Sequence, residues 1–73
     1  MGKLKILSGQ EICEILSSHG FEIVRQRGSH IVMQKKSGTP TITVPVPNHK
    51  EIKTGTLKSI IRQSKLPSSE FEI

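Results

Sequence analysis

The stretch "FEIVRQRGSHIVMQKK", residues 21–36, constrains the fold of this chain more than any other. Two runs that contain valine and isoleucine flank a Gly-Ser pair, and this pattern is typical of a β-hairpin with a two-residue turn. Such a turn also fixes which residues of the two strands lie opposite one another. The expected pairs are Arg27 with His30, Arg25 with Val32, and Val24 with Met33.

Paired residues share a face of the sheet, so this register divides the hairpin into two sets of side chains. The face expected to form the core carries Val24, Ile31 and Met33, joined by Ile42 and Val44 of the next strand. The opposite face is expected to carry Arg25, Arg27, His30, Ile23 and Val32. Exposed apolar residues beside basic ones indicate a surface that another molecule covers.

The sequence on both sides of the hairpin predicts helices. "SGQE" at residues 8–11 has the capping-box pattern and Gly20 is a suitable C-cap, so we expect a first helix from Gly9 to His19. Thr54 is expected to cap a second helix, which Pro67 ends. The residues expected on its apolar face are Leu57, Ile60, Ile61 and Ser64, and the tail "SSEFEI" is expected to dock through Phe71.

A third strand is expected in "PTITVPV", residues 40–46, after a turn at "KSGT", residues 36–39. Pro45 and Pro47 indicate that this strand lies at an edge of the sheet or ends there. The order is therefore α-β-β-β-α, an α+β fold with a three-stranded antiparallel sheet. Both helices should cover one face of the sheet and leave the other open, which is the arrangement of the double-stranded-RNA-binding domain.

The 73 residues are expected to form one domain, residues 1–73, with a small core and no deep cavity. One cysteine, Cys13, cannot form an internal disulfide, and no Cys/His cluster has the spacing of a zinc site. No apolar stretch is long enough for a signal peptide or a membrane span. We therefore expect a cytoplasmic protein without membrane association, metal or cofactor.

Positive charge is concentrated in the middle of the chain. Residues 25–65 hold nine lysines and arginines against one acidic residue, a net charge of +8. The flanking segments carry net charges of −1 (residues 1–24) and −2 (residues 66–73). Such a concentration favours a polyanionic partner, most simply a nucleic acid, over a surface that is charged only for solubility.

His30 has two interpretations. In the first, it is a polar residue at the start of a strand on a solvent-exposed face. In the second, it is a general base or acid, because a neutral imidazole can take a proton from a ribose 2′-hydroxyl. Arg25 and Arg27 would then bind phosphate and stabilise the developing negative charge. RNA carries both the nucleophile and the electrophile of this reaction, so no metal is required.

Other basic residues lie where phosphate can bind. "KTGTLK", residues 53–58, is expected to open the second helix, where backbone N–H groups and the side chains of Lys53 and Lys58 attract anions. An ordinary capped helix start is the alternative. Arg62 extends the basic stripe along the helix. His49 is either a second acid/base group or phosphate ligand, or a passive loop residue, and His19 is expected only to complement the helix dipole.

Together these segments resemble the HicA toxin family of bacterial and archaeal toxin–antitoxin pairs. The matching elements run from about Ser8 to Leu66 and are "GF", "RQRGSH", "TVPVPNH" and "GTLKSIIRQSKL". The resemblance implies a double-stranded-RNA-binding-like fold, an mRNA interferase activity and a HicB-type antitoxin partner. The family's catalytic histidine lies in its G-S-H element, which corresponds to Gly28, Ser29 and His30. Its P-x-H element implies a supporting role for His49.

The sequence thus leads to one hypothesis and one rival. The hypothesis is a metal-independent mRNA endoribonuclease that uses His30 as its acid/base residue and is inhibited by a HicB-like antitoxin on its open face. The rival is a non-catalytic RNA-binding module of the same fold.

Overall fold

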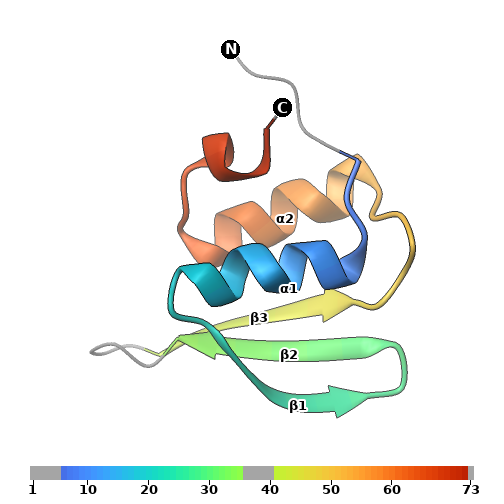
Figure 1. Cartoon of the computed structure of the whole chain (residues 1–73), viewed down its shortest axis with the longest axis vertical. Coiled ribbons are helices and arrows are strands. Elements are labelled where there is room, and N and C mark those ends of the chain that lie inside the picture. The colour runs from blue at the N-terminus through green and yellow to red at the C-terminus, as the bar shows by residue number, and fades with distance from the viewer. Residues whose placement is uncertain (1–5, 36–40, 73) are drawn as a thin grey trace.

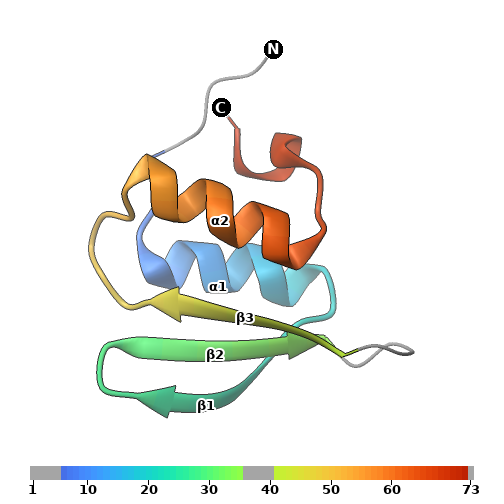
Figure 2. The same cartoon turned by 180° about the vertical axis from the view of Figure 1, so that it is seen from behind.

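The computed structural model describes residues 6–35 and 41–72. Its elements follow the expected order: α1 (Gly9–Ser18), β1 (Glu22–Arg27), β2 (His30–Lys35), β3 (Ile42–Pro47) and α2 (Thr54–Ser64). A short 3-10 helix, η1 (Ser68–Phe71), follows. The strands form one antiparallel sheet in the order β1-β2-β3, and both helices lie on the same side of it (Figures 1 and 2). The α+β class with an open sheet face is confirmed.

The first helix begins as its sequence predicts. The backbone N–H of Glu11 donates to Ser8 Oγ at 3.1 Å, and the backbone N–H of Ser8 donates to Glu11 Oε1 at 2.9 Å. This capping box satisfies two donors that would otherwise be free at a helix start. The chain leaves the helix through Gly20, whose φ of +94° is open to glycine without steric cost.

The hairpin has the expected turn but not the full expected register. Arg27 pairs with His30 and Arg25 with Val32, as predicted, and Gly28 in the turn has a φ of +55°. Between Ile23 and Arg25 the register shifts, so Met33 pairs with Ile23 and not with Val24. A β-bulge of this kind places two residues of one strand opposite one residue of its partner.

The bulge overturns the predicted faces of two residues. Ile23 was expected on the open face, but it lies on the helix side, where it lines a groove with residues of α1. Val24 was expected in the core, but it is 41% exposed and borders a hollow of the open face with Arg25 and Val32. Both side chains are β-branched and apolar, so alternation along the strand cannot reveal the extra residue.

The third strand is an edge strand, as its prolines predict. Among the described residues it pairs with β2 and with no other strand, and Pro45 and Pro47 lie opposite Val32 and His30. Of the residues in the expected strand, Pro40 lies outside the described residues, as does the turn expected at residues 36–39.

The second helix has the predicted apolar face and different ends. Leu57, Ile60 and Ser64 are buried and Ile61 packs partly buried against the core. Thr54 does not cap the helix: it is the first helical residue, and the cap position is occupied by Lys53, whose side chain makes no capping hydrogen bond. The helix ends before Pro67 because Lys65 adopts a left-handed conformation with a φ of +61°.

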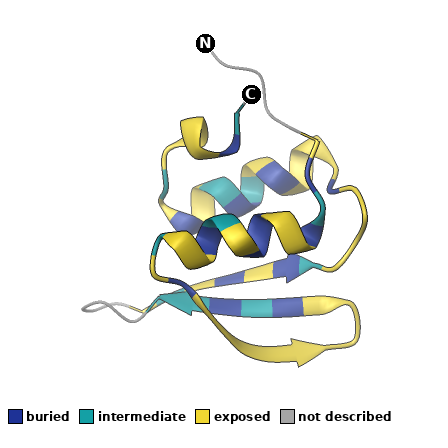
Figure 3. Ribbon diagram, viewed as in Figure 1, coloured by how far each residue is buried: buried dark blue, intermediate teal, exposed yellow. Residues whose placement is uncertain are grey.

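The core lies between the helices and the sheet (Figure 3). Its fully buried residues come from every layer and are Ile12, Leu16, Met33, Val44, Val46, Leu57 and Phe71. Phe71 docks as expected, and burial of an aromatic side chain of this size contributes on the order of 1.5–3 kcal/mol. His19 was expected only to complement the helix dipole, but it also contacts the tail. Its Nε2 lies 2.7 Å from Oε1 of Glu70, and this contact links the end of α1 to η1.

Candidate functional site

The end of the molecule that carries the hairpin turn also gathers the end of β3 and the starts of both helices (Figure 1). His30 pairs with Pro47 across the β2–β3 ladder. The backbone N–H of Asn48 donates to the carbonyl oxygen of Ser29, which fixes the chain after β3 against the hairpin turn. The backbone N–H of Gly9 donates to the carbonyl oxygen of His49 at 2.8 Å. His30 and His49 therefore lie at the same end of the molecule.

A glycine makes this arrangement possible. A Cβ atom on Gly9 would overlap the carbonyl oxygen of Pro47, at a separation that folded proteins do not contain. Only a residue without a side chain allows the first turn of α1 to start directly against the end of β3. Sequence reasoning did not single out Gly9 or Asn48, since a glycine after a helix cap and an asparagine before a loop histidine are common.

His30 is exposed at the first position of β2. Its pairing with Arg27 puts it on the open face with Arg25, as predicted, because paired residues share a face. Within residues 6–35 and 41–72, no side chain forms a hydrogen bond with its imidazole. Both ring nitrogens are therefore available to a bound molecule, as a surface acid/base residue requires.

His49 is exposed in the loop between β3 and α2 and borders two hollows. One of them, with a volume of about 240 Å³, lies between the loop and the first turn of α2 and is also lined by Pro47, Lys53 and Thr56. The other is lined by Ser8, Gln10, Asn48 and Lys50. His49 and Lys53 therefore line one hollow, together with the acidic residue Glu51.

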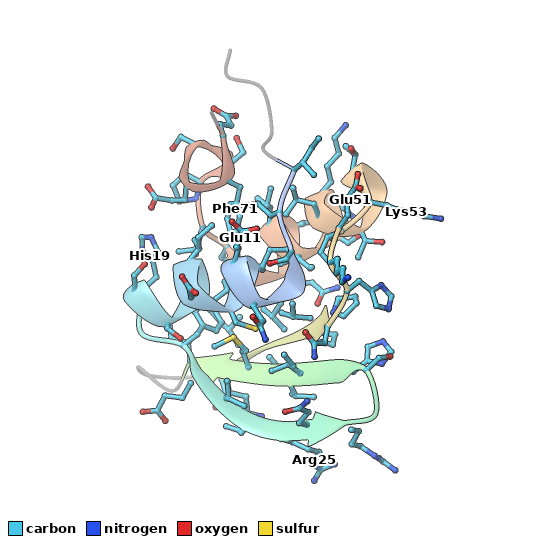
Figure 4. All side chains as sticks on the ribbon, turned by 45° about the vertical axis from the view of Figure 1, so that its right-hand side comes forward. Glu11, His19, Arg25, Glu51, Lys53 and Phe71 are labelled. Atoms are coloured by element: carbon cyan, nitrogen blue, oxygen red, sulfur yellow. The ribbon has the colours of Figure 1, made fainter. Side chains whose placement is uncertain are left out.

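The basic residues predicted to bind phosphate fall into separate groups. Arg25 and Arg27 accompany His30 on the hairpin, whereas Lys53 lies at the uncapped start of α2. Figure 4 shows Arg25 on the sheet's lower strand and Lys53 projecting outward from the helix layer. Lys58 and Arg62 are exposed four residues apart on α2, and neither borders the hollows beside His49.

Nucleophilic catalysis by the thiol is disfavoured. Cys13 is buried, and burial raises the pKa of its thiol because the thiolate is poorly solvated there.

Across the described part of the chain, no three His, Cys, Asp or Glu residues are grouped so that they could hold a metal ion. The described helices include none that is long and apolar enough to cross a membrane.

Fold and site together define a small α-β-β-β-α domain that displays a histidine and two arginines at a hairpin turn. The family model described as "HicA toxin of bacterial toxin-antitoxin" matches residues 9–66, which is most of the chain. The chain belongs to this family of toxins from toxin–antitoxin systems. A search of curated proteins found no match.

Proposed function

We propose that this protein is an endoribonuclease that cleaves mRNA, with His30 as the acid/base residue, and that a HicB-like antitoxin inhibits it. The observation that carries the proposal is the position of His30 within the HicA family match. It is exposed, has no intramolecular partner among the described side chains, and lies opposite Arg27 beside the Gly28–Ser29 turn.

The proposed reaction uses the nucleophile that RNA itself contains. His30 takes the proton of a ribose 2′-hydroxyl, and the 2′-oxygen attacks the adjacent phosphorus. The bond from phosphorus to the 5′-oxygen of the next nucleotide breaks, and that oxygen receives a proton from an imidazolium, either His30 or His49. The products are a 2′,3′-cyclic phosphate and a free 5′-hydroxyl. No electrons are exchanged and the atoms balance without a cofactor.

Arginines next to the histidine have a specific task in this reaction. The phosphorane-like transition state carries more negative charge on its non-bridging oxygens than the substrate does. Guanidinium groups of Arg25 and Arg27 can donate charge-assisted hydrogen bonds to those oxygens. A stabilisation that grows towards the transition state raises the rate and not only the affinity.

The second group of basic residues supports binding. The first turn of α2 presents backbone N–H groups without a side-chain cap, and Lys53 occupies the cap position. We propose that a neighbouring phosphate of the RNA strand binds near Lys53 and His49 at this hollow, on the side away from the carboxylate of Glu51. Lys58 and Arg62 would add charge further along the helix but would not touch the reacting phosphate.

Incubation of the pure protein with end-labelled single-stranded RNA tests the proposal. We expect fragments that end in a 2′,3′-cyclic phosphate, formed equally well in EDTA because the reaction needs no metal. A shifted but intact RNA band would instead identify a non-catalytic RNA-binding module. Cleavage that EDTA abolishes and magnesium restores would contradict the proposed chemistry.

A further inference from the structure

The outer edge of β1 is free of a partner strand in the described part of the chain. All six residues of β1 are exposed (Figure 3). Arg27 and His30 flank a two-residue turn, which makes them a hydrogen-bonded pair. The next residue, Gln26, therefore directs its backbone N–H and C=O away from β2. A free strand edge of this kind can accept a further strand from another chain.

A groove with both polar and apolar lining residues runs along the same edge. It has a volume of about 510 Å³ and runs between α1 and β1, with Cys13, Ile23 and Ile31 among its lining residues. Ile23 is 59% exposed although it faces the helix layer. The groove remains because α1 packs over the sheet towards β3 and not over β1.

We infer that the β1 edge and this groove bind an extended segment of the antitoxin as a fourth strand of the sheet. Its acidic side chains would face Arg25 and Arg27 on the open face, and its apolar side chains would enter the groove beside Ile23. The inference rests on the protein partner in the proposed function and does not depend on RNA cleavage.

Charge disfavours a second copy of this chain that pairs with β1 about Gln26. If two β1 strands paired antiparallel about Gln26, Arg25 of each copy would lie directly opposite Arg27 of the other. Like charges in directly opposed positions destabilise a strand pair. A segment with acidic residues at these two positions replaces both repulsions with attractions.

The groove and the rest of β1 define the partner segment further. Glu22 lies on the open face, because it pairs with Gln34, and it favours a basic residue opposite. Glu14 also borders the groove, so the side chains that enter should be apolar and not acidic. Along its own direction, the segment should therefore read acidic, apolar, acidic, apolar, basic, with the first residue opposite Arg27.

The peptide "TEVEVKT", blocked at both ends, provides the test, and "TKVKVET" is the charge-reversed control with the same apolar residues. Each is titrated into isotopically labelled protein while the backbone amide signals are followed. We expect "TEVEVKT" to shift the signals of residues 22–27 and of Cys13 and Ser17 across the groove. The control should bind at least roughly tenfold more weakly, because three like-charge pairs replace three opposite-charge pairs.

Two variants make the result specific. In the double variant Arg25→Glu, Arg27→Glu the preference should reverse in favour of "TKVKVET". Ile23→Lys should abolish binding of "TEVEVKT" while the rate of RNA cleavage stays unchanged, since Ile23 faces away from His30. Equal binding of both peptides, shifts confined to α2, or no shift in β1 would each overturn the inference, even if the protein cleaves RNA as proposed.

Discussion

Gly9 shows how one residue without a side chain positions the site. Replacement by alanine would bring a methyl group against the carbonyl oxygen of Pro47, and backbone atoms cannot move aside as a flexible side chain can. We expect Gly9→Ala to lower the free energy of unfolding by about 1–3 kcal/mol, the range for overpacking. Urea denaturation monitored by circular dichroism measures this change.

Gly55 is the matched control, because it also lies in the first turn of a helix. A Cβ atom there would have no neighbour within 4 Å, and its φ is not in the left-handed region. Gly55→Ala should therefore raise the free energy of unfolding by about 0.4–1 kcal/mol, since alanine restricts the unfolded chain. Similar effects of the two substitutions would show that the close approach at Gly9 is wrong.

Cys13 should react slowly in the folded protein. Its thiol is buried in the groove wall and burial raises its pKa, so at neutral pH the reactive thiolate is scarcer than in the unfolded chain. We expect alkylation by iodoacetamide to be much slower in buffer than in urea, and to accelerate as the pH rises. Equal rates in both conditions would contradict the burial of this side chain.

The sequence predicted the face on which His30 lies but not the faces of Ile23 and Val24. The two-residue turn determines the pairing of Arg27, His30 and Arg25, since no irregularity intervenes. Between Ile23 and Arg25, towards the start of β1, the bulge exchanges the faces of Ile23 and Val24. Local sequence cannot distinguish these two residues because both are apolar and β-branched. The predicted cap of α2 was wrong. Thr54 has a side chain that can cap a helix, but it is already the first helical residue and Lys53 occupies the cap position.

At the scale of elements, α2 permits a test of its start as a phosphate site. RNA affinity should fall with salt, and the logarithmic slope should change by about 0.7 for each phosphate of a single strand that the protein no longer neutralises. Lys53→Gln should flatten the slope by about that amount. Lys65→Asn, which removes a charge at the other end of α2 and tolerates the left-handed conformation, should leave it unchanged.

The slopes come from binding isotherms of cleavage-deficient protein at several salt concentrations. If both lysine variants changed the slope equally, the contribution of α2 would be diffuse charge and not a site.

The elements themselves were predictable because caps, alternation and apolar periodicity agree along this chain. The capping box of α1, the edge prolines of β3 and the apolar stripe of α2 each match the structure.

In the whole molecule, the fold brings together residues that lie on different elements of the sequence. His30 and His49 are nineteen residues apart, and their common location follows from β3 pairing with β2 and from the backbone hydrogen bonds of Gly9 and Asn48. The sequence placed each histidine on its element but could not predict these contacts, which depend on how α1 meets the end of β3. The division of the basic residues between hairpin and α2, in contrast, follows from the elements that the sequence predicts.

In the proposed function, His30 carries out the chemistry and the surrounding basic residues supply the affinity. Single-turnover cleavage of labelled RNA by His30→Ala tests it most directly, with His19→Ala as the control histidine at the far end of α1. Thermal melting and RNA affinity are measured on the same samples. Where His30→Ala melts early, His30→Gln, which is closer in size and polarity, replaces it.

Loss of a general acid/base residue slows a reaction by about 10²–10⁴-fold. We expect a fall of this size for His30→Ala, with melting temperature and RNA affinity close to those of the wild type, and an unchanged rate for His19→Ala. A correctly folded His30 variant that binds RNA and still cleaves it at nearly the wild-type rate would show that His30 is not the acid/base residue.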